Sequence, residues 1–249
     1  MAAYGRLCTL FHDAQHPRAS DAEVAWYSDR LPRDSGPVLE AMAGSGRLLL
    51  PLLERRVNVH GVDLSPARVA SCEARLAAAG LTTSIFRQDV VTLNVPFRYG
   101  AAIVAAGSFQ RLVDPVAAQK ALARIRAHLV GPGLLLMDLY VPAEALHPPG
   151  APEVHVQTVA LPDGTKLARR SEVSVDTEGK RIDIRSRFEQ RERAKIIARE
   201  DETLALTWYG EDEIIELVRQ AGYAEVSVGP SAKAESPGDE RRYSLSACA

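Results

Sequence analysis

The sequence predicts an α/β protein in which a doubly wound parallel sheet carries an antiparallel meander inserted before its last helix. From residue 37 to 140, short apolar runs alternate with segments of helical period, an order typical of βαβ units. From 153 to 208, apolar and charged residues alternate with period two, as in strands with one face in water. Because 249 residues suit one large domain, we expect residues 1–249 to form a single domain, with 152–208 as an inserted subdomain.

The first half of the chain shows the expected punctuation of strands and helices. A first helix begins at Ser20, because Glu23 stands three residues later and the pair forms a capping box. Later helices begin at Ser65-Pro66 and Asp114-Pro115, where a capping side chain precedes a proline in the first turn. Strands are expected over 37–43, 57–63, 83–89, 100–106 and 134–139, and helices over 20–31, 46–55, 65–80 and 114–131.

The end of the chain returns to the α/β pattern. A helix is expected over 211–221, followed by strands over 224–228 and 242–247. No helix separates these two strands, so we expect them to pair as an antiparallel hairpin. Within the meander the basic and acidic residues nearly cancel, and we interpret its many arginines as a solvated strand face rather than a binding patch.

The charge balance bears on the class of partner. The chain carries 30 Lys and Arg against 32 Asp and Glu, a net charge of −2. Such a chain has no field that would attract nucleic acid or an anionic membrane, so we expect neither as a partner. A small molecule is expected instead.

The cysteines and the apolar segments bear on location. Cys8, Cys72 and Cys248 show no CxxC spacing, so neither a disulfide framework nor a metal cluster is expected. We find no signal-peptide pattern at the N-terminus and no apolar run near the roughly 20 residues that cross a bilayer. These observations predict a protein of the reducing cytoplasm.

Three acidic residues fall at the ends of successive predicted strands. Glu40 precedes the glycine turn Gly44-Ser-Gly46, Asp63 ends the second strand, and Asp89 ends the third. Glycines at such a turn let the backbone approach a ligand closely, and a carboxylate after the second strand can accept hydrogen bonds from ribose hydroxyls. In an open parallel sheet this edge is where ligands bind.

At these residues the chain resembles the class I S-adenosylmethionine-dependent methyltransferases. The first motif of that family is an acidic residue followed by a GxGxG turn, and residues 40–46 resemble it with Met42 in place of the first glycine. The resemblance continues through 61–66, 88–90, 105–112 and 128–133. It implies a Rossmann-like sheet of seven strands in the order 3-2-1-4-5-7-6, with strand 7 antiparallel.

The resemblance also implies a cofactor and its site. The cofactor would be S-adenosyl-L-methionine, with S-adenosyl-L-homocysteine as product. Asp63 would hold the ribose hydroxyls, Asp89 and Val90 would border the adenine, and residues 41–46 would pass under the methionine moiety. The residues expected at the cofactor are Tyr4, Glu40, Ala41, Met42, Ala43, Gly44, Gly46, Asp63, Leu64, Asp89, Val90, Ala106 and Gly107.

The inserted meander resembles that of small-molecule members such as the glycine and amino-sugar N-methyltransferases, in which it covers the active site together with the N-terminal helices. The resemblance implies methyl transfer to nitrogen or oxygen of a small-molecule acceptor by direct in-line displacement. The residues expected at the acceptor pocket are Phe11, Phe109, Trp208 and Tyr209. The candidate catalytic bases are His12, His16 and Tyr140, with His147 and Asp138 as further titratable groups near the rim.

Other interpretations of the same residues stay open. A nicotinamide-dependent oxidoreductase would need a third glycine where Arg47, Leu48 and Leu49 stand. A non-catalytic S-adenosylmethionine-binding protein would keep the donor site and use the meander as an interaction surface. Phe11 and Trp208 also fit a plain hydrophobic core. Exposed meander strands offer an edge for a homodimer, and the sequence does not name the acceptor.

Overall fold

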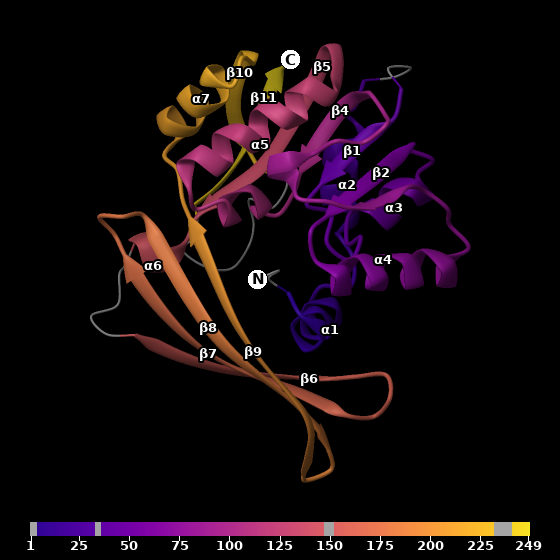
Figure 1. Cartoon of the computed structure of the whole chain (residues 1–249), viewed down its shortest axis with the longest axis vertical. Helices are drawn as coiled ribbons and strands as arrows, with labels where there is room; N and C mark the ends of the chain where they lie inside the picture. The colour runs from indigo at the N-terminus through magenta and orange to yellow at the C-terminus, as the bar shows by residue number, and fades with distance from the viewer. Residues whose placement is uncertain (1–3, 33–35, 147–151, 232–240) are drawn as a thin grey trace.

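The computed structural model describes residues 4–32, 36–146, 152–231 and 241–249, which form two sheets (Figure 1). The larger sheet has seven described strands in the order β10-β11-β5-β4-β1-β2-β3. Neighbours from β3 to β5 pair in parallel, whereas β11 runs antiparallel to both β5 and β10. The strands are β1 (Val38–Ala41), β2 (Val59–Asp63), β3 (Ile85–Arg87), β4 (Tyr99–Val104), β5 (Leu129–Val141), β10 (Ala224–Pro230) and β11 (Arg241–Cys248). The predicted strand order and closing hairpin are confirmed.

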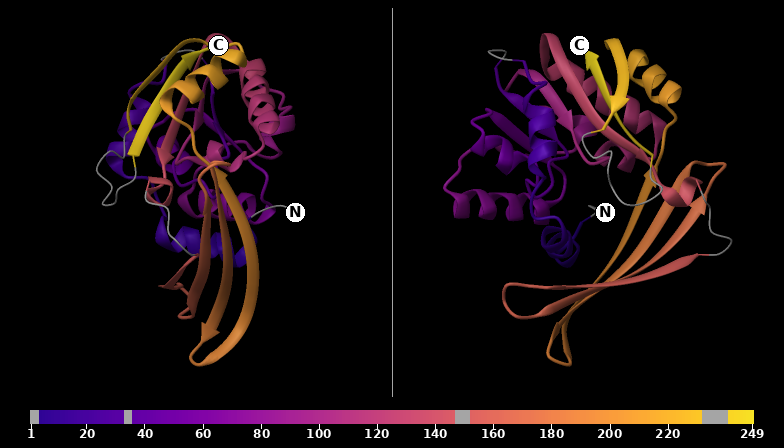
Figure 2. Two further views of the ribbon diagram at one scale, coloured as in Figure 1. Left: turned by 90° about the vertical axis from the view of Figure 1, so that its left-hand side faces the viewer. Right: turned by 180° about the vertical axis from the view of Figure 1, so that it is seen from behind.

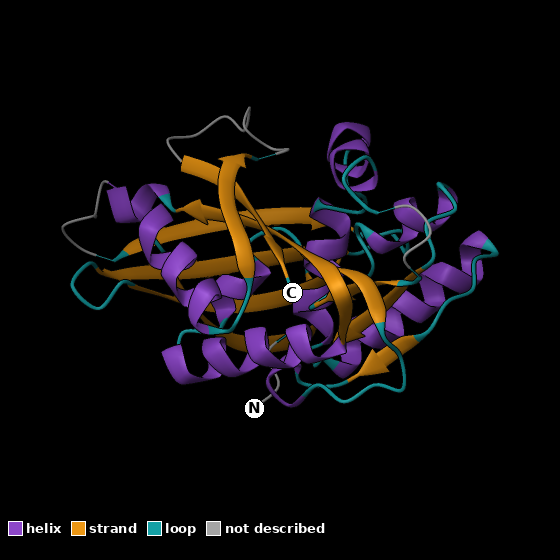
Figure 3. Cartoon of the chain, turned by 90° about the horizontal axis from the view of Figure 1, so that it is seen from above, coloured by secondary structure: helices purple, strands orange, loops and turns teal. Residues whose placement is uncertain are grey.

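Helices cover both faces of this sheet (Figure 3). The helices are α1 (Arg6–Gln15), α2 (Asp21–Ser28), α3 (Leu49–Glu54), α4 (Pro66–Ala79), α5 (Pro115–His128), α6 (Ala143–Leu146) and α7 (Glu211–Gln220), with short 3₁₀ helices η1 (Val90–Thr92) and η2 (Ser108–Arg111). Successive residues of β1 face opposite layers: Leu39 packs in the core with Leu122 of α5, and Val38 in the core with Leu52 of α3. This alternation fixes the sheet between two apolar layers.

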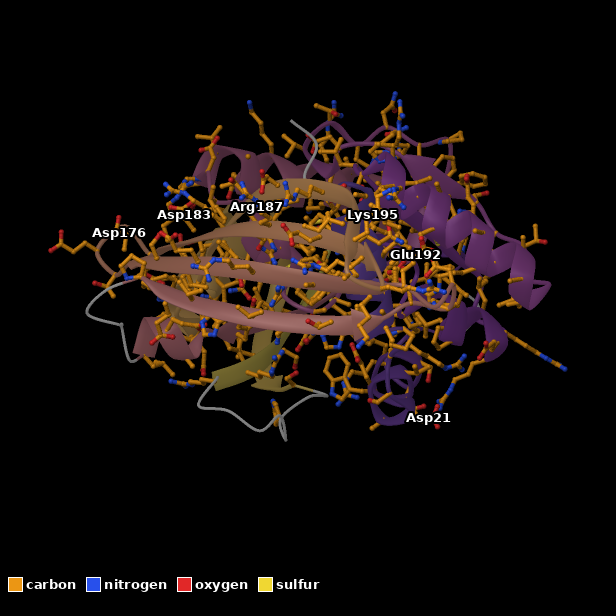
Figure 4. All side chains as sticks on the ribbon, turned by 90° about the horizontal axis from the view of Figure 1, so that it is seen from below. Asp21, Asp176, Asp183, Arg187, Glu192 and Lys195 are labelled. Atoms are coloured by element: carbon orange, nitrogen blue, oxygen red, sulfur yellow. The ribbon has the colours of Figure 1, made fainter. Side chains whose placement is uncertain are left out.

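The smaller sheet is the predicted meander. Its strands β6 (Glu153–Ala160), β7 (Lys166–Asp176), β8 (Arg181–Glu192) and β9 (Lys195–Thr207) pair antiparallel in sequence order. Figure 2 shows this sheet extending away from one end of the larger sheet. Ile182 and Phe188 are buried on its inner face, while Arg187 is exposed on the outer face and donates to Asp201 at 2.8 Å (Figure 4). Arg169 is an exception to the predicted solvated arginines, because it shares the inner face with Phe188 and is half-buried.

Several predicted boundaries change for physical reasons. The helix expected from residue 46 begins only at Leu49, because residues 42–48 are taken up by turns. The third strand is shorter than expected, Ile85–Arg87. At α2, Ser20 Oγ accepts from the backbone N–H of Glu23 as predicted, at 3.2 Å. The Glu23 side chain does not complete the predicted capping box: its buried carboxylate instead accepts two hydrogen bonds from Arg47, at 2.6 and 2.7 Å.

Helix α1 lies between α4 and the inner face of the smaller sheet (Figure 1). The sequence predicts a first helix only from Ser20, so α1 was not expected. Its apolar residues Leu7, Cys8 and Phe11 are buried against Phe188 and other apolar residues of that sheet. Within residues 4–32, 36–146, 152–231 and 241–249, no helix is both long and apolar enough to cross a bilayer.

The N-terminus of α1 is capped by carboxylates from β9 rather than by its own N-cap side chain. Glu200 accepts from the backbone N–H groups of Leu7 and Cys8, at 3.0 and 2.8 Å, and Glu202 accepts from that of Gly5. A Cβ on Gly5 would lie 2.6 Å from the Glu200 carboxyl carbon, so a larger residue there would require the Glu200 side chain to shift. Negative charge at a helix N-terminus is stabilising.

We predict that Glu200→Ala lowers the free energy of unfolding by about 1–2 kcal/mol, because two helix-terminal N–H groups lose their acceptor. Urea denaturation measures this change, and hydrogen exchange of the α1 amides should speed up. Asp201→Ala is the matched control, since its ion pair with Arg187 is exposed to solvent and screened, and contributes little to stability. Equal destabilisation by the two variants would contradict the capping role.

Candidate active site

The glycine turn after β1 stands at the carboxyl edge of the parallel strands. Met42, Gly44 and Gly46 have positive φ angles of 60°, 59° and 79°. A Cβ on Gly46 would lie 2.4 Å from Leu50 Cδ1, so the turn and the following helix can approach only with glycine there. Ala41 and Ala43 on either side of Met42 are buried. The predicted sharp turn is confirmed.

Asp63 at the end of β2 holds this turn in place. One of its carboxylate oxygens accepts from the backbone N–H of Gly44 at 2.8 Å, and the other accepts from that of Ser65 at 2.9 Å. Asp63 therefore bridges the glycine turn and the start of α4. The next residue, Leu64, is 50% exposed.

Glu40 is a buried carboxyl group in β1. Its side chain is 4% exposed, and Oε2 has no hydrogen-bond partner among the described residues. Burial raises the pKa of Glu40 to about 8; the charge of Arg47 opposes this shift, while those of Glu23 and Asp63 add to it. The group is therefore largely protonated at neutral pH in the absence of a ligand.

The third and fourth strands place four further predicted residues at this edge. Asp89 caps η1 by accepting from the N–H of Val91 at 2.9 Å, and Val90 is buried. After β4, Ala106 and Gly107 have positive φ angles of 56° and 67°. The structure thus brings the predicted residues of β1 to β4 to one edge.

Tyr4 joins this edge from the N-terminal segment. Its backbone oxygen accepts from Ser65 Oγ at 2.6 Å, and its ring lies 3.6 Å from the Arg68 guanidinium carbon. The ring of His12 lies edge-on to that of Tyr4, with centroids 5.7 Å apart. Helix α1 thereby sets Tyr4 over the beginning of α4.

The candidate bases differ in their surroundings. Burial, together with the positive charges of Arg68, Arg169 and Arg111, lowers the pKa of His12 to about 3. A neutral imidazole with so low a pKa can accept a hydrogen bond but is a weak base near neutral pH. His16 is exposed at the C-terminal end of α1.

Gln110 in η2 is a structural residue that the sequence analysis did not identify. It is 1% exposed, and its amide nitrogen donates to the backbone oxygens of Tyr140 and Thr207, both at 2.8 Å. Its amide oxygen accepts from the N–H of Tyr140 at 3.0 Å. Gln110 thus ties η2 to the ends of β5 and β9 and fixes the backbone of Tyr140. A Cβ on Gly107 would lie 2.3 Å from the Tyr140 ring.

The predicted pocket residues divide between core and edge. Phe11 is fully buried against Phe188, and Trp208 is buried among apolar residues of the smaller sheet, as the core interpretation predicts. Phe109 is buried in the core of the larger sheet, 6.0 Å from the ring of Tyr209. Tyr209 remains partly exposed. His147 lies outside the described residues.

A surface hollow of about 360 Å³ lies at the opposite, amino edge of the sheet. It is lined by Asn94, Val95, Pro96, Phe97, Arg98, Arg124, Ala127 and His128. The Nε2 atom of His128 is already hydrogen-bonded there, since it accepts from the N–H of Val95 at 3.2 Å. None of the predicted site residues lines this hollow, so the candidate active site is the carboxyl edge.

Comparison with protein families agrees with this geometry. Residues 38–133, from β1 to the start of β5, match the family model described as a methyltransferase domain. By this match the segment from β1 to the start of β5 resembles a methyltransferase domain, and the match covers less than half of the chain. A protein of Geobacillus sp. (strain WCH70) assigned by name to the methyltransferases is 27% identical over 103 residues, which span 41% of this chain and 42% of that protein. The match therefore covers less than half of that relative.

Solved structures resemble the chain over nearly its whole length. A S-adenosylmethionine-dependent methyltransferase from Clostridium acetobutylicum ATCC 824 has a TM-score of 0.75 at 15% identity, covering 96% of each chain. The sugar N-methyltransferase KedS8 from Streptoalloteichus sp ATCC 53650 has a TM-score of 0.76 at 20% identity, covering 100% of this chain and 94% of that one. These likenesses confirm the predicted fold class, in which the methyltransferase domain carries the additional sheet.

We predict that Glu40→Gln removes a pH dependence of stability. The pKa of Glu40 is raised on folding. Its contribution to the free energy of unfolding therefore falls as pH rises from about 4.5 to about 8 and is constant outside that window. Relative to the variant, the wild-type methyltransferase domain should lose on the order of 3–5 kcal/mol of unfolding free energy across this window. Urea denaturation at pH 4.5 and pH 9 measures the difference, and parallel pH profiles for the two proteins would contradict the prediction.

Proposed function

We propose that the protein is an S-adenosylmethionine-dependent methyltransferase that methylates nitrogen or oxygen of a small-molecule acceptor. The observation that carries the proposal is the joint placement of Glu40, the glycine turn and Asp63 at the carboxyl edge of a methyltransferase domain. An open parallel sheet binds nucleoside ligands at this edge.

The residues present fit such a donor. Glu40 Oε2 is a buried acceptor without a hydrogen-bond partner among the described residues, as expected of a group that receives a ligand's amino group. The backbone of the glycine turn is close-packed, with no room for a Cβ on Gly46. Each Asp63 oxygen accepts one backbone N–H and keeps a second lone pair, so the carboxylate can still accept from two ribose hydroxyls. Asp89 and Val90 stand one strand further along, where the adenine would lie.

The protein's own contribution to the reaction is placement and exclusion of water. When bound, S-adenosylmethionine would supply an activated methyl group, and S-adenosylhomocysteine would be the leaving group of a direct in-line displacement by the acceptor. Alignment and a dry site are then the main requirements. His12, neutral at physiological pH, can accept a hydrogen bond from an acceptor N–H or O–H, and the hydroxyl of Tyr140 is the remaining candidate base on β5. His16, exposed at the far end of α1, ranks below both.

We infer that residues 152–208 act as a lid over this edge. The support is the contact of its inner face with α1, and the residue Tyr4, just before α1, reaches the start of α4. Gln110 links the lid strand β9 directly to η2. Phe109 and Tyr209 would then form the wall of the acceptor pocket nearest β4.

The first acceptors to test are small amines. Two proteins whose solved structures have the same layout are KedS8, a sugar N-methyltransferase, and CalS10 from Micromonospora echinaspora, an amino pentose methyltransferase (TM-score 0.68, 20% identity). The cytoplasmic location and a homodimer formed through the meander stay predictions of the sequence.

We predict that Asp63→Ala weakens binding of S-adenosylhomocysteine at least tenfold in titration calorimetry, because the ribose hydroxyls lose a charged acceptor worth about 1.5–3 kcal/mol per hydrogen bond. Asp63→Asn, which keeps one acceptor oxygen, should lose less. Glu73→Ala, an exposed carboxylate on α4, is the matched control and should bind as wild type. Unchanged affinity in Asp63→Ala would refute the donor assignment, and tighter binding of a nicotinamide cofactor would favour an oxidoreductase. Donor binding without transfer to any amine, phenol or acid of a panel would favour a non-catalytic binding protein.

A further inference from the structure

Arg111 is a partly buried cation, and no carboxylate is among the groups of the described residues that act on its charge. It is the last residue of η2, and its Nη1 is buried without a hydrogen-bond partner in those residues. The groups that interact with its charge are Tyr4, Tyr140 and Cys8. Phenols and thiols carry no charge near pH 7, so none of these groups offsets the charge of the guanidinium. A buried charge without a partner is costly, which makes an anionic ligand the natural complement.

Two more arginines face the same space. Arg169 extends from the inner face of β7, with its guanidinium carbon 5.0 Å from the Phe11 ring and its Nε buried without a partner among the described residues. Arg68 lies over Tyr4 from α4, and Arg111 lies 5.9 Å from the same ring. The charges of all three act on His12. The space between α1, η2 and the smaller sheet is therefore bordered by three cations from three separate elements.

The two carboxylates that act on Cys8 together with Arg68 and Arg111 already accept hydrogen bonds. Glu200 and Glu202 on β9 also interact with Cys8, but their oxygens accept from backbone N–H groups at the start of α1. The partial positive charge of the helix terminus offsets part of their negative charge. Three guanidinium groups against two engaged carboxylates leave this space with a surplus of positive charge.

Arg68 and Arg111 lie on different sides of the candidate donor site, as the order of the strands shows. The donor would extend from Asp89 on the β3 side to the glycine turn on β1, and Arg68 reaches that turn, since its Nη1 lies 2.6 Å from where a Cβ on Gly44 would stand. Arg111 lies on the other side, after β4 and beside Tyr140 of β5. Arg111 thus borders the space beyond the reactive end of the donor, where the acceptor must lie.

We propose that the methyl acceptor carries an anionic group, a carboxylate or a phosphate, and that Arg111 binds it with the help of Arg169. A planar guanidinium with free N–H groups binds either anion through paired hydrogen bonds. This inference rests on the proposed function, because it assigns the acceptor side of the same site.

Titration calorimetry with inorganic phosphate and with acetate, at constant ionic strength, tests the proposal on protein saturated with S-adenosylhomocysteine. Wild type should bind at least one of the two probes, and Arg111→Gln should bind it at least tenfold more weakly. Arg169→Gln should show an intermediate loss. Arg170→Gln, an exposed neighbour on the opposite face of β7, is the matched control and should bind as wild type. Phosphate binding alone indicates a phosphorylated acceptor, and acetate binding alone a carboxylate.

Two further measurements separate the possible failures. Because Arg111→Gln removes an unpaired buried charge, its melting temperature should equal or exceed that of wild type, whereas an arginine kept for structure would lower it. S-adenosylhomocysteine should bind Arg111→Gln as it binds wild type. The proposal is overturned if neither anion binds wild type, if Arg111→Gln binds the anion equally well, or if the variant loses donor affinity by the same factor. If wild type does not bind S-adenosylhomocysteine, the proposed function fails, and the same anion titration on the ligand-free protein still decides the role of Arg111.

Discussion

The carboxylate of Asp63 is the interaction on which the candidate site depends. It joins the N–H of Gly44, in the turn after β1, to the N–H of Ser65, at the start of α4. Ser65 in turn donates to the backbone of Tyr4, so the same short chain of contacts reaches the N-terminal segment. One side chain at a strand end thereby sets the glycine turn, the direction of α4 and the position of Tyr4.

Helix α1 extends this arrangement to the smaller sheet. Its apolar side packs on Phe188, and its free N-terminal amides are satisfied by Glu200 and Glu202. Gln110 makes a second connection between the two sheets, from η2 to Thr207. Two independent links of different chemistry therefore hold the smaller sheet at the edge that carries the candidate donor site, and the arginines of η2, α4 and β7 meet between them.

The sequence predicts the larger sheet well because its strands are short apolar runs bounded by glycines, prolines and capping residues, and these signals are local. The turn at Gly44 and the caps at Ser65 and Asp114 belong to the same class. Helix α1 was missed because its apolar residues become a core face only against β7 and β8, far along the chain. Gln110 was missed for the same reason, since its partner Thr207 lies 97 residues away.

The most direct test of the central claim is a crystal structure of the protein with S-adenosylhomocysteine. The account predicts the ribose hydroxyls on Asp63, the adenine beside Asp89 and Val90, and the amino group of the homocysteine within hydrogen-bond distance of Glu40 or of the glycine turn. It also predicts that the sulfur faces the space bordered by Tyr4 and Arg111. A ligand bound away from this edge, or with its ribose away from Asp63, would contradict the account.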